Sequence, residues 1–200
     1  MSGMQDADCS RRDQHFLQLF DGPDSRAAAV AAFVQQGLLN HETTVIVVTP
    51  EHRIAVLQRL RRSGVDVDRA QAIGQLIIRD AAHVLRLFER RGRLDPNLFD
   101  ASVGAQMRQL TAQGRVRVYG EIVDLLAAQG NYAGAQLLEN LWNDLQTRMS
   151  FTLFCGYSSE NFGDPLTAGS LRSICRSHCH SISHPNDLLG SFLLRTHVEA

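Results

Sequence analysis

The sequence predicts an α/β fold in which a mainly parallel β-sheet is flanked by helices. Short apolar runs alternate with helical patterns along most of the chain, an order typical of parallel sheets with right-handed helical crossovers. The run at residues 43–48 (TTVIVV) is apolar without alternation, as expected for a strand that is covered on both faces. It is followed by Thr49, Pro50 and Glu51, a capping hydroxyl, a proline and an acid that together favour the start of a helix.

In the first half of the chain, each predicted strand is followed by a helix that opens on a proline, an acid or a capping side chain. We expect Gly37 to end the first of these helices and Gly64 to end the second. The strands are predicted at residues 15–20, 43–48 and 76–78. The helices are predicted at residues 23–37, at 50–63 and from residue 80 onward.

The second half repeats this alternation and then loses it. A helix is expected from Asp95 and Pro96 to about residue 113, and another is expected to be capped by Asn131 and to bury an apolar stripe that includes Trp142. Further strands are predicted at residues 115–119 and 151–157, with a helix between Gly120 and Gly130. Residues 1–13 are predicted to be disordered, and residues 163–200 to form a helix followed by an irregular end rich in cysteine and histidine.

Composition excludes several classes of function. The 200 residues suit one domain, and 44% hydrophobic residues suffice for a folded core. A net charge of −1 gives no electrostatic basis for direct nucleic-acid binding. All 20 basic residues are arginine, so no lysine is present for Schiff-base chemistry or for a phosphate-binding loop. We therefore predict no cofactor.

The sequence also indicates the cellular setting. It has no apolar run of 18 residues and no apolar stretch at its N-terminus, so neither a membrane partner nor a signal peptide is expected. Its four cysteines are few and irregularly spaced, which favours a reduced cytoplasmic location over a disulfide scaffold.

A ligand site is expected where the strands end. Ligands of open α/β sheets bind beyond the carboxyl ends of the strands, and the predicted strands place Asp21, Glu121 and Tyr157 there. The turn at residues 21–26 (DGPDSR) has one glycine, a proline and two acids, which is the wrong chemistry for a phosphate. Glu121 is either a ligand contact in this crevice or an acid that the helix dipole favours at a helix N-terminus.

Other polar residues on predicted core elements are ligand-binding candidates with a structural alternative. Arg117 lies on a covered strand and needs a partner, and we expect an ion pair with Glu121 or Glu139. His15 opens the first strand and is either a ligand or base, or a hydrogen-bonded core residue. Glu139 and Asn143 share one edge of a helix, where mutual hydrogen bonding is the structural alternative to ligand binding.

The C-terminal region carries the densest group of metal-ligand residues. On a helix, Cys175, His178 and Cys179 would share a face, and with His184 they offer a tetrahedral zinc site. The alternative is an ordinary helix with a buried cysteine face. Cys155 lies in an apolar strand and is expected to be buried and inert. The chain contains neither GxSxG nor GxGxxG.

Several strings in the sequence resemble those of MEDS domains, which are sensory domains of methanogen and methylotroph regulators. They are HFLQLF at 15–20, VYGEIVDLL at 118–126, GNY at 130–132, LENLWN at 138–143 and FCGY at 154–157. The resemblance covers residues 14–162, which we take as the sensory domain. The residues that match the motifs by position are His15, Glu121, Glu139, Trp142, Asn143, Cys155 and Tyr157.

The resemblance implies a RecA-like fold, similar to the clock ATPase KaiC, in which the phosphate-binding loop has degenerated. It further implies a non-enzymatic sensory or regulatory module for a small-molecule ligand or a partner protein. Such domains are usually attached to kinase or DNA-binding output domains. Because 200 residues leave no room for one, we expect signalling to a separate histidine kinase or transcription regulator, with a homodimer as a further form of partnership. The alternatives are a residual nucleotide- or metal-dependent hydrolase and a pure protein-interaction subunit.

Overall fold

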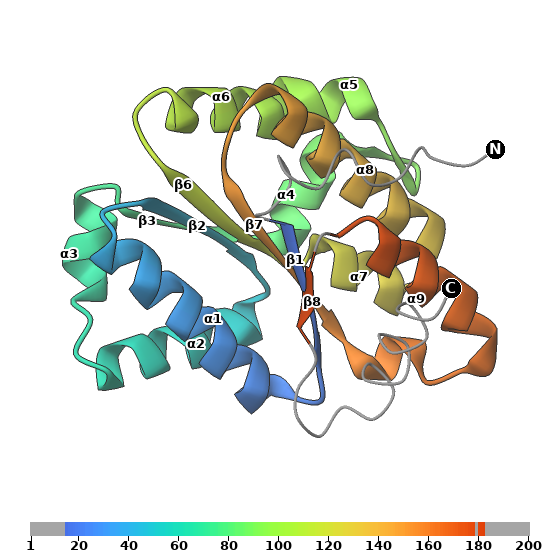
Figure 1. Ribbon diagram of the computed structural model, residues 1–200, viewed down its shortest axis with the longest axis horizontal. Helices are drawn as coiled ribbons and strands as arrows, with labels where there is room; N and C mark the ends of the chain where they lie inside the picture. The colour runs from blue at the N-terminus through green and yellow to red at the C-terminus, as the bar shows by residue number, and fades with distance from the viewer. Residues whose placement is uncertain (1–14, 179, 183–200) are drawn as a thin grey trace, which may run out of the picture.

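The computed structural model describes residues 15–178 and 180–182, and these residues form a parallel β-sheet between two layers of helices (Figure 1). The sheet has six strands in the order β3-β2-β6-β7-β1-β8, and every neighbouring pair in it is parallel. The strands are β1 (His15–Phe20), β2 (Thr43–Val48), β3 (Leu76–Asp80), β6 (Val116–Gly120), β7 (Thr152–Ser158) and the short edge strand β8 (His180–Ile182). The predicted α/β class with a mainly parallel sheet is confirmed. The prediction of disorder for residues 1–13 lies outside the described residues.

One layer of helices covers the sheet face that Phe20, Ile46 and Phe154 line. This layer consists of α1 (Pro23–Leu39), α2 (Pro50–Arg62) and α3 (Val67–Ala72). The other layer covers the opposite face, and Figure 1 shows its main helices on the far side of the sheet from α1 and α2. It consists of α4 (Ala81–Phe88), α5 (Pro96–Phe99), α6 (Ala105–Thr111), α7 (Ile122–Ala128), α8 (Tyr132–Arg148) and α9 (Ala168–Arg176). A two-stranded hairpin of β4 (Glu89–Arg90) and β5 (Arg93–Leu94) follows α4.

The capping signals of the sequence act as predicted. The side chain of Thr49 accepts a hydrogen bond from the backbone N–H of His52, and Asp80 and Asn131 cap α4 and α8 in the same way. Such side chains satisfy backbone donors that the first helical turn leaves without partners. The caps at Thr49 and Asp80 fix where α2 and α4 begin after β2 and β3.

Strand alternation decides which side chains meet below α8 and α9. Successive residues of a strand face opposite sides of the sheet. Cys155 and Tyr157 of β7 therefore belong to the core beneath α8, whereas Phe154 belongs to the core beneath α1. Residue 15 of β1 pairs with residue 153 of β7, so His15 lies on the same side as Cys155.

Two local predictions differ from the structure. Gly37 does not end the first helix, because α1 continues to Leu39. A Cβ at Gly37 would clash with the side chains of Thr44 and Arg117, so this glycine serves a close approach of α1 to the sheet. The helix predicted from residue 95 to 113 is interrupted by a π-helical turn at Asp100–Gly104.

Candidate functional site

At the carboxyl edge of the sheet, Glu121 is the centre of a buried polar group that we call the edge network. It comprises Arg26, Thr49, His52, Tyr119, Glu121 and Asp124. Glu121 is 1% exposed, and its Oε2 accepts hydrogen bonds from the backbone N–H of Thr49 at 3.1 Å and from Nδ1 of His52 at 2.8 Å. Its Oε1 accepts one from the hydroxyl of Tyr119 at 3.1 Å. Every contact of this carboxylate is therefore with a donor.

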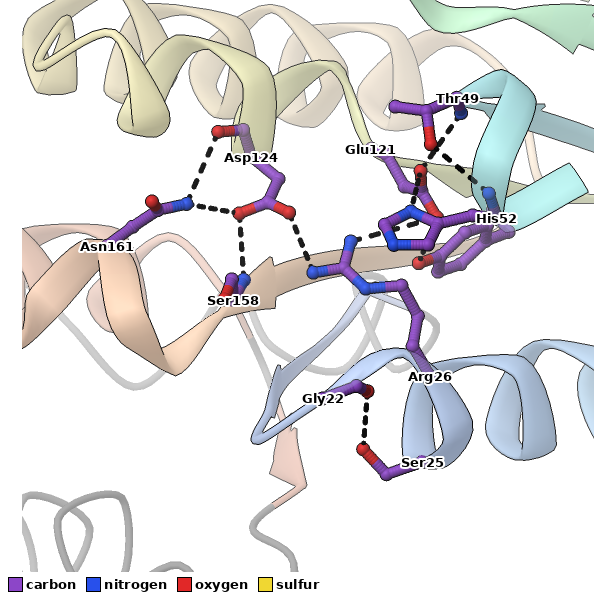
Figure 2. Close-up of polar contacts among 10 residues, drawn as sticks. Gly22, Ser25, Arg26, Thr49, His52, Glu121, Asp124, Ser158 and Asn161 are labelled. Atoms are coloured by element: carbon purple, nitrogen blue, oxygen red, sulfur yellow. Dashed lines mark hydrogen bonds and ion pairs between the residues drawn. The ribbon is translucent and has the colours of Figure 1, made fainter. Parts of the chain in front are cut away.

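Arg26 supplies the positive charge of the edge network (Figure 2). It comes from the first turns of α1, and its guanidinium lies 3.7 Å from Glu121 and donates to Asp124 at 2.7 Å. Asp124 also accepts from the backbone N–H of Ser158 at 2.7 Å and from the side chain of Asn161 at 2.6 Å. Burial opposes the charge of Arg26, but Tyr119 and the carboxylates of Asp124 and Glu121 outweigh it and raise the pKa of Arg26. The two carboxylates of the edge network thus share the single cation of Arg26.

Arg117 lies elsewhere, beside the C-terminal part of α1. The prediction that it pairs with Glu121 or Glu139 is wrong, because its Nε donates to Glu42. A second nitrogen of its guanidinium donates to the backbone carbonyl of Phe33 at 2.9 Å, and the guanidinium stacks over the Phe33 ring. Glu42 lies directly before β2 and is not one of the two partners predicted for Arg117. Arg117 and Glu42 thus form a structural ion pair, and the contacts of Arg117 with Phe33 hold α1 to the sheet.

Beneath α8 and α9, four side chains converge in a second buried group, which we call the four-residue cluster. Its members are His15 of β1, Glu139 of α8, Cys155 of β7 and His178 after α9, and their ligand atoms all lie within 4.8 Å of one another. The Sγ of Cys155 lies 3.2 Å from Oε2 of Glu139 and 3.4 Å from Nε2 of His15. Nε2 of His15 lies 3.3 Å from the same carboxylate oxygen. Four segments that are far apart in sequence thus place nitrogen, oxygen and sulfur donors around one point.

Each member of the four-residue cluster except the thiol is held by a further partner. Nδ1 of His15 lies 2.9 Å from Oδ1 of Asn143, and the hydroxyl of Tyr157 donates to Oε1 of Glu139 at 2.7 Å. The rings of His15 and His178 are in contact, with centroids 4.1 Å apart. The expected hydrogen bond between Glu139 and Asn143 is replaced by these contacts.

Burial and charge shift the pKa values within the four-residue cluster. Burial, together with repulsion from His178, lowers the pKa of His15 although Glu139 and Asn143 act in the opposite direction. Burial alone would raise the pKa of Glu139, but the charge of His178 and the contacts of His15 outweigh it and lower this pKa. Burial and the neighbouring Glu139 raise the pKa of Cys155 well above its ordinary value. Cys155 is therefore not an activated nucleophile, as its apolar strand predicts.

An apolar cavity of about 40 Å³ borders both the sheet and the layer of α6, α7 and α8. It lies between β2, β6 and β7 on one side and these helices on the other, and Cys155 and Trp142 form part of its wall. Most other wall residues are aliphatic, among them Val47, Leu110 and Leu138. Cys155 thus lines the cavity and also belongs to the four-residue cluster.

The predicted ligand-binding candidates fall into separate places. His15, Glu139, Asn143 and Tyr157 lie together, whereas Glu121 lies in the edge network and Asp21 is exposed in the turn before α1. Tyr157 lies within β7, one residue before its end, and its side chain is buried against Glu139. The single crevice expected from the sequence is therefore replaced by two groups.

The predicted zinc site is only partly described. His178 lies in the four-residue cluster, Cys175 lies on α9, and Cys179 and His184 lie outside the described residues. The zinc site of Cys175, His178, Cys179 and His184 stays a prediction.

Some site residues escaped the sequence reasoning. Arg26, His52 and Asp124 were not identified, although Arg26 and His52 lie in the first turns of predicted helices that start at the carboxyl edge. Cys155 was expected to be inert core, yet it shares a strand face with Tyr157 two residues later. The two-residue spacing between Cys155 and Tyr157 was the sequence signal that could have placed Cys155 beside the other site residues.

Comparison with known protein families identifies the chain as a sensory domain. The match is to the MEDS family, described as the methanogen/methylotroph, DcmR sensory domain, over residues 14–178, and the chain belongs to this family. The matched region includes all members of the edge network and of the four-residue cluster. No curated protein matches the chain. Within the described residues, no helix is both long enough and apolar enough to cross a membrane.

Proposed function

We propose that this domain is a non-catalytic signal-sensing module that binds a small apolar molecule in the cavity beside Trp142 and Cys155. The observation that carries the proposal is this cavity of about 40 Å³ with aliphatic and aromatic walls. A buried water needs at least 10–15 Å³ of such space and polar partners, so an apolar cavity of this size suits an apolar molecule of a few non-hydrogen atoms. Membership of a sensory family supports the same function.

The position of the cavity suggests how binding would be transmitted. Its walls join strands of the sheet to α4, α6, α7 and α8, so one ligand contacts several elements that pack against each other. A ligand that fits one arrangement of these helices better than another shifts the population toward that arrangement. We propose a histidine kinase or a transcription regulator as the partner that responds to this shift.

The edge network supports a non-catalytic role and a RecA-like ancestry for the fold. A phosphate-binding loop would follow β1 and open α1, but Pro23 at the helix start lacks a backbone donor, and Arg26 is already engaged by Glu121 and Asp124. Glu121 is engaged by three donors of the protein itself. We infer that this corner descends from a nucleotide site whose phosphate contacts have been replaced by an internal ion pair.

A thermal-shift series tests the proposal with xenon and with short alkanes and alcohols of one to about three carbons. We expect the wild-type chain to be stabilised by the smaller apolar probes and not by ATP with magnesium. The Val47→Ile variant adds a methyl group to the cavity wall and is expected to abolish the stabilisation, while its own stability changes by less than about 1.5 kcal/mol.

Val48→Ile is the matched control, because Val48 is the next residue of the same strand and packs in the opposite helix layer. This variant is expected to keep the response. Equal loss of response in both variants, or a large and specific stabilisation by ATP with magnesium, would contradict the proposed ligand site.

A further inference from the structure

We propose that His15, Glu139, Cys155 and His178 bind a divalent transition-metal ion, with zinc as the best match. The donor set of two imidazoles, one thiolate and one carboxylate is drawn from the ligands that zinc uses in four-coordinate sites. The inference is independent of the ligand proposed for the cavity. It also differs from the predicted C-terminal zinc site, with which it shares only His178.

The spacing of the donors suits tetrahedral coordination. Bonds of 2.0–2.3 Å from a central zinc place neighbouring ligand atoms about 3.3–3.8 Å apart. Nε2 of His15, Sγ of Cys155 and Oε2 of Glu139 are separated by 3.2, 3.3 and 3.4 Å, which makes one nearly regular triangular face. Nε2 of His178 lies 3.3 Å from Oε1 of Glu139, and all four ligand atoms lie within 4.8 Å of one another.

The hydrogen bonds outside the cluster orient both imidazoles for metal binding. The amide nitrogen of Asn143 donates to the backbone carbonyl of Ser177 at 2.9 Å, so its oxygen faces His15 and accepts from Nδ1. Nδ1 of His178 likewise donates to the carbonyl of Ile174 at 2.8 Å. With the Nδ1 protons committed outward, a neutral ring directs the Nε2 lone pair into the cluster, the arrangement found in metal-ligating histidines.

With both imidazoles neutral, a hydrogen-bonded cluster without a cation leaves one atom without a partner. The thiol of Cys155 and the hydroxyl of Tyr157 can both donate to Glu139, but Nε2 of His178 is buried and has no hydrogen-bond partner among the described residues. Leaving a buried polar atom without a partner is unfavourable. A metal ion would accept both Nε2 lone pairs and replace the repulsion between these lone pairs and the carboxylate by attraction.

The charges balance as well. A divalent cation with one thiolate, one carboxylate and two neutral imidazoles has no net charge, which suits a site whose four side chains are buried. Binding deprotonates Cys155, and the proton leaves to solvent as the metal–sulfur bond forms. The bonds from Tyr157 and Asn143 then act as the outer contacts that hold the ligands in place.

The test uses the full chain, stripped with a chelator and titrated with Zn²⁺ and then with Co²⁺. We expect about one equivalent of tightly bound zinc, a rise in Tm on zinc addition, and a sulfur-to-cobalt charge-transfer band in the cobalt form. The Cys155→Ser variant is expected to lose the band and most of the zinc affinity. Tyr157→Phe, which removes only an outer contact, is expected to weaken binding about 10- to 100-fold.

Cys175→Ser is the matched control, since Cys175 lies on α9 and is not one of the four donors. It is expected to keep the band and the affinity. If Cys155→Ser does not fold, Glu139→Gln takes its place, because glutamine preserves the shape and removes the anionic ligand. Loss of the band in Cys175→Ser with retention in Cys155→Ser would move the metal to the C-terminal set, and absence of zinc binding in the wild-type chain would overturn the inference.

Discussion

Two glutamates, Glu121 and Glu139, are almost completely buried on this small domain, and their surroundings are opposite in kind. Glu121 is surrounded by groups that donate to it and by the cation of Arg26. Glu139 is surrounded by two imidazole Nε2 atoms whose protons are directed elsewhere, by a thiol and by one hydroxyl. Both carboxylates accept hydrogen bonds, but Glu139 also faces Nε2 of His178, which has no hydrogen-bond partner among the described residues.

This difference separates a structural network from a site that awaits a ligand. Burying a charge is unfavourable unless hydrogen bonds and an opposite charge compensate for it. In the edge network both kinds of compensation come from α1, α2 and β6, which it ties together. In the four-residue cluster the compensation is incomplete, and a cation from solution completes it.

The largest expected effect is on the edge network. Arg26→Met keeps much of the side-chain volume but removes the buried cation, so Glu121 and Asp124 lose their counter-charge. Removing one partner of a buried ion pair typically costs about 3–5 kcal/mol, and we expect the free energy of unfolding in urea to fall by that amount. Zinc is expected to give no rescue.

Arg53→Met is the control for this experiment, because Arg53 is exposed on α2. Its effect is expected to stay within about 0.5 kcal/mol. Equal stability of Arg26→Met and the wild-type chain would show that the edge network is not balanced by Arg26, and the contrast with Glu139 would disappear.

The two glutamates can be compared directly by the same isosteric change. In Glu121→Gln, an amide NH₂ faces groups that themselves donate, and we expect a loss of about 2–3 kcal/mol in the free energy of unfolding. In Glu139→Gln, the NH₂ is offered to an imidazole Nε2 that lacks a donor, so the metal-free variant is expected to lose less than about 1 kcal/mol or to gain stability.

Both variants are measured by urea unfolding in the presence of a chelator, so that only internal contacts count. Equal destabilisation by the two substitutions would contradict the comparison, since it would mean that Glu139 is as fully satisfied as Glu121. A stable Glu139→Gln variant that still binds zinc at full affinity would leave the comparison intact and count against the metal site.

The pattern of the sequence predicts the strands because each is a buried apolar run. Residues 15–20 and 43–48 have the predicted bounds, and the strand predicted at 151–157 is shifted by one residue. The helix starts at residues 50 and 81 follow from local side-chain caps, and the start at residue 23 follows from its proline, so none of them depends on the rest of the chain. Gly37 was misinterpreted because its role depends on Thr44 and Arg117, which only tertiary packing brings near it.

The candidate sites show the same division between local and distant causes. The location of Glu121 follows from the rule that strands of a parallel sheet end at one edge, but His52 lies 69 residues away along the chain. His15 and Cys155 are 140 residues apart, and they meet because β1 is inserted next to β7. Strand order is not encoded in the periodicity of any one strand, so the approach of His15 to Cys155 was not predictable from spacing.

The smallest expected effect concerns a carboxylate on the surface, which provides the exposed reference for the two buried ones. Asp100 is 41% exposed and accepts from Arg108 at 3.1 Å and from Arg148 at 2.9 Å. These hydrogen bonds, that of Arg108 foremost, lower the pKa of Asp100 below its ordinary value. The stability they supply is therefore present above the ordinary pKa of an aspartate and is lost as the pH falls toward the lowered one.

We expect Asp100→Asn to lower the Tm slightly near neutral pH and the difference from wild type to vanish on acidification below the range of an ordinary aspartate, about pH 3.9. Salt at about 1 M should remove most of the difference as well, because exposed charges are screened over a few ångströms. The same salt should leave the effect of Arg26→Met largely unchanged, since its ion pairs are buried. A salt-insensitive effect at Asp100, or a salt-sensitive one at Arg26, would show that burial does not distinguish these carboxylates in the way that their contacts indicate.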